Sequence, residues 1–183
     1  LGAPIAYIIR ARVVLLRDLG ASLSPANAFQ LIQGLETLPL RFREHQANAA
    51  KVTSFLEDHD AVSRVIYPSL FGGAEKALAD KYLAKGHGAL VGLELIGGID
   101  AGRAFIDALK LIYHVANIGD ARSLAIHPAS TTHSQLSAAD QLAAGVTPGY
   151  VRLSVGIEHS DDIIADISQA LDTASAISIK TVA

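Results

Sequence analysis

The chain of 183 residues contains no cysteine, no methionine and no tryptophan. Without cysteine, a disulfide framework, a thiolate metal site and a cysteine nucleophile are excluded. Methionine is missing even at position 1, which is Leu1. Removal of an initiator methionine favours a small second residue, and leucine is not small. We therefore expect the sequence to be a trimmed or proteolysed piece of a longer protein.

Aromatic residues and basic patches are also scarce. Aromatics make up 5% of the chain and hydrophobic residues 50%, so the predicted core is aliphatic. The net charge is −3, and no basic patch suited to nucleic acid is present. The most apolar stretch, residues 6–19, is interrupted by Arg10, Arg12 and Arg17, so we expect no membrane segment. The lack of cysteine fits a reducing cytoplasm, where we expect the protein.

The first 58 residues are predicted to be helical. Apolar residues recur at helical spacing over residues 6–19. Ser24 followed by Pro25 predicts the start of a second helix, because serine caps helix N-termini and proline is tolerated in the first turn. A break is expected near residues 37–39, before a longer amphipathic helix at 39–58. The predicted inward face of that helix consists of Phe42, His45, Ala49, Val52 and Leu56.

Residues 59–183 are predicted to form an α/β (α+β) domain, a small sheet with helices on one face. Alternation and short apolar runs predict strands at residues 61–66, 89–96, 113–118 and 151–157. Periodicity and capping residues predict helices at residues 75–84, 100–110 and 160–177, the second of them capped by Asp100. Residues 119–140 are expected to be irregular, and residues 178–183 to form a frayed tail.

Common catalytic motifs are missing from the chain. It has no G-x-S-x-G nucleophile motif, no P-loop and no dinucleotide-binding glycine pattern. His127 and His133 are six residues apart across a proline, which is poor spacing for metal ligands. We interpret them as structural or surface histidines and predict no metal site.

Arg152 is the first candidate for a ligand-binding residue. Strand alternation places Arg152 on the same face as Ser154, Gly156 and Glu158, opposite the core-facing residues. An arginine held on a rigid strand beside small residues is suited to clamping a carboxylate with two parallel hydrogen bonds. The alternative interpretation is a solvated arginine, or one paired with a nearby acid.

Residues 119–133 form the second candidate. Long loops inside compact domains are usually functional or disordered. The hydroxyl and backbone groups of Pro128, Ser130, Thr131 and Thr132 could face a ligand. The alternative is a proline-anchored surface loop whose serines and threonines cap the loop itself. The residues alone leave these two interpretations open.

Four segments resemble one enzyme family, and they occur in the same order along the chain. Three of them, VRLSVGIEHSDDIIADISQAL (151–171), ANIGDARSLAIHPASTTHSQL (116–136) and YPSLFGGAEKALADKYLAKGHGALVGLEL (67–95), are similar to the Cys/Met-metabolism pyridoxal-phosphate enzymes. The fourth, RDLGASLSPANAFQLIQGLETLPLR (17–41), looks most like the O-acetylhomoserine sulfhydrylase branch of that family. The resemblance covers nearly the whole chain, which makes it more specific than any single motif.

The resemblance implies the C-terminal part of an aspartate-aminotransferase-like (fold type I) enzyme. Residues 1–58 would then link to a missing cofactor domain, and residues 59–183 would be the C-terminal small domain. The family's arginine in R-L-S-V-G-[IL]-E binds the substrate α-carboxylate, and it matches Arg152. Asn117 and Thr132 match residues near the same carboxylate. Related lyases tend to carry serine in place of Asn117.

The activity that the resemblance implies for the full-length enzyme is a transferase reaction. It replaces the acetyl ester of O-acetylhomoserine with sulfide or a thiol, giving homocysteine or methionine, and it needs pyridoxal phosphate. The partners implied are a small amino-acid substrate and further copies of the chain. The family's Schiff-base lysine, in a Ser-x-Thr-Lys type motif, has no counterpart here. We therefore expect no catalytic residue, no bound cofactor and no activity in this chain alone.

Two alternatives stay open beside this interpretation. The parent could be another member of the family, such as cystathionine γ-synthase, cystathionine lyase or methionine γ-lyase, although Asn117 and residues 17–41 argue against it. The chain could instead be a stand-alone, non-catalytic interaction module. The missing initiator methionine argues against that second alternative.

Overall fold

The structure, a computed structural model, describes residues 4–182, with side chains described as far as residue 176. Its contacts divide the chain into two compact units that separate between Pro39 and Leu40. We expected a division at residues 58 and 59. The difference arises because helix α4 (Leu38–Glu57) contributes Val52 and Leu56 to the hydrophobic core of the second unit.

The described part of the first unit is helical. Its elements are α1 (Ala6–Arg10), the π-helical η1 (Ala11–Leu16), α2 (Arg17–Leu19) and α3 (Pro25–Glu36). Gly20 ends α2 in a left-handed conformation with a φ of 66°. Ser24 caps α3, since its Oγ accepts a hydrogen bond from Asn27 N at 3.2 Å. The helix predicted at 6–19 and the cap at Ser24 are confirmed, and none of these helices has a buried residue.

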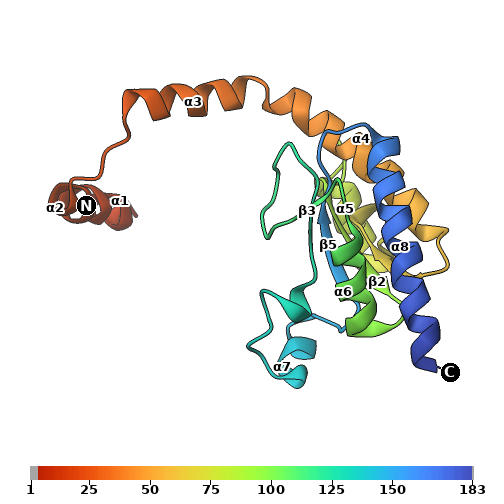
Figure 1. The fold of residues 1–183 in the computed structure, drawn as a ribbon. Coiled ribbons are helices and arrows are strands. Elements are labelled where there is room, and N and C mark those ends of the chain that lie inside the picture. The colour runs from red at the N-terminus through yellow and green to blue at the C-terminus, as the bar shows by residue number, and fades with distance from the viewer. Residues whose placement is uncertain (1–3, 183) are drawn as a thin grey trace. The chain divides into compact units, whose positions relative to one another are not determined.

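The second unit is built on a five-stranded mixed sheet (Figure 1). Its strands are β1 (Val62–Ile66), β2 (Leu90–Leu95), β3 (Tyr113–His114), β4 (Leu124–Ile126) and β5 (Tyr150–Ser154). Their order across the sheet is β1-β2-β5-β4-β3, with β3 and β4 parallel and the other neighbours antiparallel. Strand β5 therefore has a hydrogen-bonded neighbour on each side, which holds its backbone in place.

Helices α6 (Gly98–Ala108) and α8 (Ser160–Val182) lie side by side against the sheet (Figure 1). With α4 and alternate residues of β2 and β5 they form one hydrophobic core. Its largest fully buried side chains include Leu56, Leu93, Phe105, Leu153, Ile163, Ile167 and Leu171. Each such side chain stabilises the fold by about 1.5–3 kcal/mol relative to an exposed one. Inward alternation was predicted for Val151, Leu153, Val155 and Ile157. The first three are buried, whereas Ile157 lies beyond the end of β5 and is only partly buried.

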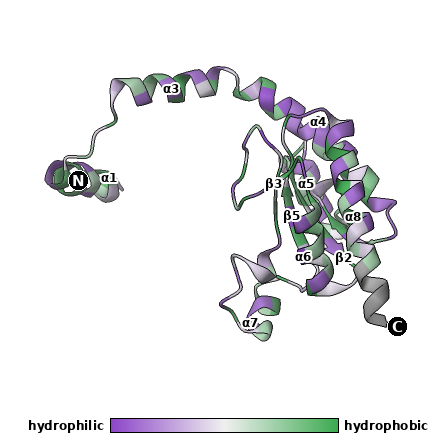
Figure 2. Ribbon diagram, in the orientation of Figure 1, coloured by the Kyte–Doolittle hydropathy of each residue, from purple (hydrophilic) through white to green (hydrophobic). Residues whose placement is uncertain are grey.

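Helix α4 combines apolar and polar contacts with the rest of the second unit. Its predicted inward face is confirmed at His45, Ala49, Val52 and Leu56. The prediction is wrong for Phe42, because the side chain of Phe42 is 47% exposed. His45 Nδ1 donates to the Val155 carbonyl at 2.7 Å. Asn48 Nδ2 donates to the carbonyls of Gly156 and Glu158 at 3.1 and 2.8 Å. Figure 2 shows many hydrophilic residues on α4. The bonds from His45 and Asn48 hold this helix to the segment after β5.

The strands differ from the prediction in three places. Strand β3 covers two residues and not 113–118, because only two residue pairs align with β4. Strand β4 lies within 119–140, where we expected irregular structure. Strand β5 ends at Ser154 and not at 157, since the Gly156 amide bonds instead to the Ser123 hydroxyl at 2.8 Å.

Two helix boundaries also differ. Helix α6 begins at Gly98, after Gly97 with a φ of 102°, so Asp100 lies in the first turn and is not the cap. Helix α8 continues to Val182, so the tail expected from residue 178 is helical there, and residue 183 lies outside the described residues. The shorter elements are η2 (Pro68–Leu70), α5 (Gly73–Tyr82), η3 (Pro128–Ser130) and α7 (Ala138–Ala143).

Candidate functional site

Arg152 stands in the middle of the sheet, on β5. Its direct neighbours are Gly92 on β2 and Ile126 on β4, neither of which is charged. Arg152 Nη2 donates to the backbone carbonyl of Asn117 at 3.3 Å. Arg152 Nε is buried and has no hydrogen-bond partner among the described residues. A buried donor without a partner costs about 1–3 kcal/mol, so the described residues leave part of the Arg152 guanidinium unsatisfied.

A cavity of about 650 Å³ adjoins Arg152. Two of the three predicted site residues, Arg152 and Thr132, line this cavity, together with His133 and Tyr150. Ile126 and Val146 add apolar surface. Small-molecule sites are mostly apolar clefts of about 300–1,000 Å³ with a few convergent polar groups. The cavity therefore has the size and the mixed lining of such a site.

Asn117, the third predicted residue, reaches the site through its backbone. Its carbonyl accepts the hydrogen bond from Arg152, while its side-chain Oδ1 accepts from Ile118 N at 2.9 Å. The neighbouring Ala116, and not the Asn117 side chain, lines the cavity. In this structure Asn117 orients Arg152, and its amide is engaged in a local turn.

The loop after β4 is well ordered by its own hydrogen bonds. Gln141 Nε2 donates to the carbonyls of Ala129 and His133 at 3.1 and 2.8 Å. Thr132 Oγ1 lies 2.9 Å from His133 Nδ1, within hydrogen-bond distance. The loop therefore caps itself internally, as the second interpretation states. Thr132 also lines the cavity, and a ligand-binding role for the loop stays a prediction.

Tyr150 is a cavity residue that the sequence interpretation missed. It precedes Arg152 by two residues on β5 and so shares its face of the sheet. Its ring occupies the space over Gly92, where a Cβ would lie 2.8 Å from the ring carbon Cε2. Burial raises the pKa of Tyr150, an effect that Arg152 opposes and Glu94 supports. The phenol is therefore protonated at neutral pH and able to donate a hydrogen bond.

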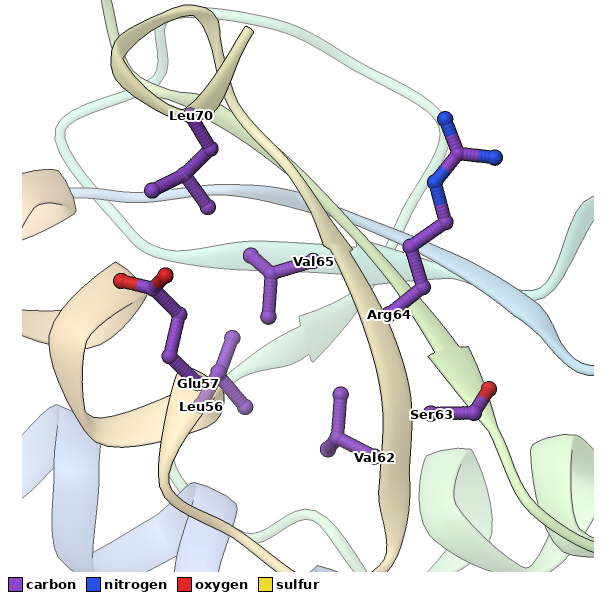
Figure 3. A pocket seen from close by; sticks show the side chains of 7 residues that line it. All are labelled: Leu56, Glu57, Val62, Ser63, Arg64, Val65 and Leu70. Carbon is purple, nitrogen blue, oxygen red and sulfur yellow. The ribbon is translucent and has the colours of Figure 1, made fainter. Parts of the chain in front are cut away.

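A second cavity, of about 290 Å³, lies beside β1 (Figure 3). Its walls include Leu56, Val62 and Val65, and Glu57 points towards the same side of the strand (Figure 3). Arg64 projects from the opposite side of the strand, away from Glu57 (Figure 3). The polar groups here do not converge, so the Arg152 cavity is the better candidate.

The described residues around Arg152 do not fit covalent attachment of pyridoxal phosphate. None of the lysine side chains that the structure describes lines the Arg152 cavity. Lys51 donates to Ser160 Oγ at 2.9 Å, and Lys76 pairs with Asp80. Lys85 lines a different cavity. The site can bind and orient a ligand, and its described residues offer no amine to carry the cofactor.

Neither a metal-binding cluster nor a membrane-spanning helix is found among the described residues. No group of three or more histidine, aspartate or glutamate side chains within it could hold a metal ion. No helix among residues 4–182 combines the length and apolarity needed to cross a membrane.

Comparison with known proteins identifies the relatives of this chain. It is 54% identical to the O-acetyl-L-homoserine sulfhydrylase of Leptospira meyeri over 171 residues, which is 93% of this chain and 39% of that protein. It is 50% identical to the O-acetyl-L-homoserine sulfhydrylase of Corynebacterium glutamicum, covering 91% of this chain and 38% of that protein. The chain therefore spans about two fifths of the length of these relatives.

A solved structure and a family match agree with these relatives. A Campylobacter jejuni protein described as an O-acetylhomoserine (thiol)-lyase, whose crystal structure contains a pyridoxyl-lysine, superimposes with a TM-score of 0.83 at 46% identity. The match covers 94% of this chain and 41% of that one. Residues 6–172 match the Cys/Met metabolism PLP-dependent enzymes. The chain belongs to the family of Cys/Met metabolism PLP-dependent enzymes.

Proposed function

We propose that this chain supplies the substrate-carboxylate site of a pyridoxal-phosphate-dependent O-acetylhomoserine sulfhydrylase. The observation that carries the proposal is the position of Arg152, which lines a cavity together with Thr132 and has no ion-pair partner among the described residues. A substrate carboxylate in that cavity would give the guanidinium its acceptor. The site supports the carboxylate role, and the names of the relatives support the reaction.

The interpretation of Arg152 as a solvated or acid-paired side chain agrees less well with the structure. Among the described residues, no carboxylate forms an ion pair with Arg152. Its Nη2 is held by the Asn117 carbonyl, while Nε faces no acceptor. A guanidinium oriented on one edge and unsatisfied on another is preorganised for a planar, two-oxygen acceptor. We infer that a carboxylate in the cavity accepts from the guanidinium of Arg152 and that the hydroxyls of Thr132 and Tyr150 bind nearby oxygens.

The reaction proposed for the whole enzyme replaces the acetyl ester of O-acetylhomoserine with sulfide or a thiol, giving homocysteine or methionine. When bound, pyridoxal phosphate supplies the electron sink that such replacement chemistry needs. This chain would bind the carboxylate end and fix the substrate's orientation, which lowers the entropic part of the barrier. Since no described lysine lines the site, we propose that the chain is inactive alone and that the cofactor is held by residues outside it.

Domain organisation, assembly and location are proposed on the same basis. Residues 59–183 would be the C-terminal small domain of a fold type I enzyme. The helices before residue 59 would link it to a cofactor domain, and the last of them, α4, also packs on the core of the small domain. The exposed apolar residues of the first unit, such as Phe29, Leu31 and Ile32, support packing against other protein and a homo-oligomeric assembly. We propose a cytoplasmic location.

Two other functions are consistent with part of these observations. A related member of the family, such as cystathionine γ-synthase, would use the same carboxylate site. The identities of 54% and 50% to O-acetyl-L-homoserine sulfhydrylases favour the sulfhydrylase. A non-catalytic interaction module would have no use for an unsatisfied arginine beside a cavity.

Substitution of Arg152 in the full-length enzyme tests the proposal. Arg152→Ala removes the charge and Arg152→Lys removes the planar fork. Charged hydrogen bonds are worth about 1.5–3 kcal/mol each, so Arg152→Ala should lower kcat/KM for O-acetylhomoserine by roughly 10- to 1000-fold. The absorbance of the bound cofactor should stay unchanged. A kcat/KM within about twofold of wild type, a difference of only ~0.4 kcal/mol, would place the carboxylate elsewhere.

A further inference from the structure

Both carboxylate oxygens of Glu158 accept hydrogen bonds from the same residue, Ser123. Glu158 Oε1 accepts from the Ser123 backbone N–H at 2.7 Å, and Oε2 accepts from the Ser123 hydroxyl at 2.9 Å. Ser123 is only 1% exposed. Its Oγ also accepts from Gly156 N at 2.8 Å. The hydroxyl is therefore fixed between a carboxylate and an amide, and it has one orientation that satisfies both.

The backbones on either side of this contact are in close approach. A Cβ on Gly156 would lie 2.3 Å from Glu158 Oε2 and 2.4 Å from Ser123 N. The contact therefore requires glycine at position 156. Ile157 N also donates to the Ala121 carbonyl at 2.9 Å. Several hydrogen bonds thus hold the segment after β5 to the segment before β4. The bonds to Glu158 are charge-assisted, because their acceptor is a carboxylate.

A further hydrogen bond connects this region to Asn117, the residue that binds Arg152. Gly119 N donates to Ser154 Oγ at 3.1 Å, which places residues 117–119 along the end of β5. Asn117, two residues before Gly119, offers the carbonyl that accepts from Arg152 Nη2 at 3.3 Å. That bond is already long for an N–H···O contact. A small shift of residues 117–123 would therefore break it and free the guanidinium to adopt other rotamers.

We propose that Glu158 is a positioning residue for the substrate site: by holding Ser123 it fixes residues 117–123, and through the Asn117 carbonyl it orients the Arg152 guanidinium towards the substrate carboxylate. The inference rests on the proposed function of Arg152. Glu158 itself faces Ser123 and is not among the residues that line the Arg152 cavity. Its contribution to binding is indirect and depends on Arg152 being present.

A double-mutant cycle in the full-length holoenzyme tests this dependence. Glu158→Ala, Glu158→Gln and Ser123→Ala are each made in the wild type and in Arg152→Ala. Glu158→Ala should raise KM for O-acetylhomoserine about tenfold or more, because misplacing a binding group by about an ångström can cost up to ~100-fold. Glu158→Gln should show a smaller increase, since its carbonyl oxygen can still accept from Ser123 N. The absorbance of the bound cofactor should be unchanged.

Comparing the Glu158 substitutions in the wild-type and Arg152→Ala enzymes distinguishes a positioning role from simple stabilisation of the fold. If Glu158 acts through Arg152, the increase in KM should shrink to within about twofold in the Arg152→Ala enzyme, because the two effects are not additive for residues in one network. An equal increase in both backgrounds would overturn the inference, as would a wild-type KM in Glu158→Ala. If Glu158→Ala does not fold, Glu158→Gln and Ser123→Ala are judged by the same criterion.

Failure of the inference and failure of the proposed function give different results. If Arg152→Ala lowers kcat/KM while the Glu158 and Ser123 variants leave KM unchanged, only the positioning role is wrong. If Arg152→Ala has no effect on kcat/KM, the proposed carboxylate site is wrong and the inference falls with it.

Discussion

Gly102 of helix α6 lies directly against the imidazole ring of His127, where a Cβ on residue 102 would lie 2.4 Å from His127 Nε2. The ring is 1% exposed. Its Nε2 is 2.7 Å from the Pro148 carbonyl, which can only accept, so Nε2 carries the hydrogen. Nδ1 is 2.8 Å from the Ser130 hydroxyl. His127 is thus a buried structural histidine that ties α6 to the loop after β4 and to the approach to β5.

Gly102→Ala is therefore expected to destabilise the protein by about 1–3 kcal/mol, because added volume at a closely packed contact forces side chains or backbone to move. The change in free energy of unfolding can be measured by urea denaturation. Gly34→Ala is the matched control, since Gly34 also lies in a helix and a Cβ added there would have no atom within 4 Å. Alanine in that helix should be neutral or stabilising by up to about 1 kcal/mol. Equal effects of the two substitutions would show that the His127 contact has no energetic consequence.

Protonation of His127 should lower stability in mildly acidic solution. Burial lowers the pKa of His127 below its usual 6.5; Arg103 and His114 act in the same direction, while the bond to Pro148 and the charge of Glu94 oppose it. The unfolded chain then binds the proton more readily than the folded one. The stabilisation is complete above about pH 6.5 and is lost as the pH falls towards the lower pKa of the folded state.

The measurement is the free energy of unfolding between pH 7.5 and 5 for the wild type and for His127→Gln, a range chosen to bracket the usual pKa of about 6.5. The glutamine amide can still donate to the Pro148 carbonyl, and it does not titrate. The wild type should lose more stability than the variant as the pH falls. Parallel pH profiles for the two proteins would contradict the assignment of the titration to His127.

Asp166 is expected to contribute strongly to stability. Its carboxylate is 6% exposed and accepts from the backbone amides of Lys110, Leu111 and Ile112 at 2.9, 2.9 and 3.0 Å. Hydrogen bonds to charged groups are worth about 1.5–3 kcal/mol each, and buried donors left without a partner cost more. Asp166→Ala should therefore lower the free energy of unfolding by roughly 3 kcal/mol or more.

Asp172→Ala provides the matched control for Asp166, because Asp172 is an exposed aspartate in the same helix, α8. It should change stability by no more than about 0.5 kcal/mol. Chemical denaturation of the two variants side by side checks the difference. A loss in Asp166→Ala no larger than that in the control would mean that the three amides find other partners.

Local patterns in the sequence predicted the elements with strong periodicity or caps. The cap at Ser24, the inward alternation of β5 and the buried stripe of α4 from His45 to Leu56 follow from residues close together in the chain. Strand β4 was missed because its three residues, Leu124–Ile126, give too short a pattern. It exists because β3 and β5 pair with it on either side.

The candidate site was predictable only in part, for a similar reason. Arg152 and Thr132 were identified by their residue types and motifs, and they do line one cavity. Asn117 was identified from the resemblance to the family, and the contact that the structure contains is made by its backbone carbonyl. Tyr150 was missed because the alternation was followed only from Val151 onward. The pairing of Glu158 with Ser123 joins residues 35 apart, which no local pattern encodes.

The exposed apolar residues of the first unit should cause self-association of the 183-residue chain. Phe29 and Ile32 are 62% and 54% exposed, and both lie on α3. Contiguous apolar surface of this kind is uncommon on soluble monomers. Light scattering should therefore report a mass above that of the monomer of 19.2 kDa. The double substitution Phe29→Gln and Ile32→Gln keeps helix propensity and should reduce the mass. A monodisperse wild-type monomer would contradict this expectation.

Incubation of this chain with pyridoxal phosphate should give no specific covalent adduct. The cofactor is attached through a lysine amine, and none of the lysines whose side chains are described lines the Arg152 cavity. Lys85 is the strictest test among them, because it lines another cavity, of about 600 Å³, together with His87. After borohydride reduction and peptide mapping, modification should be weak and spread over several exposed lysines. The Lys85→Arg variant should show the same scattered pattern, whereas one dominant adduct that disappears in Lys85→Arg would show that this chain holds a cofactor site of its own.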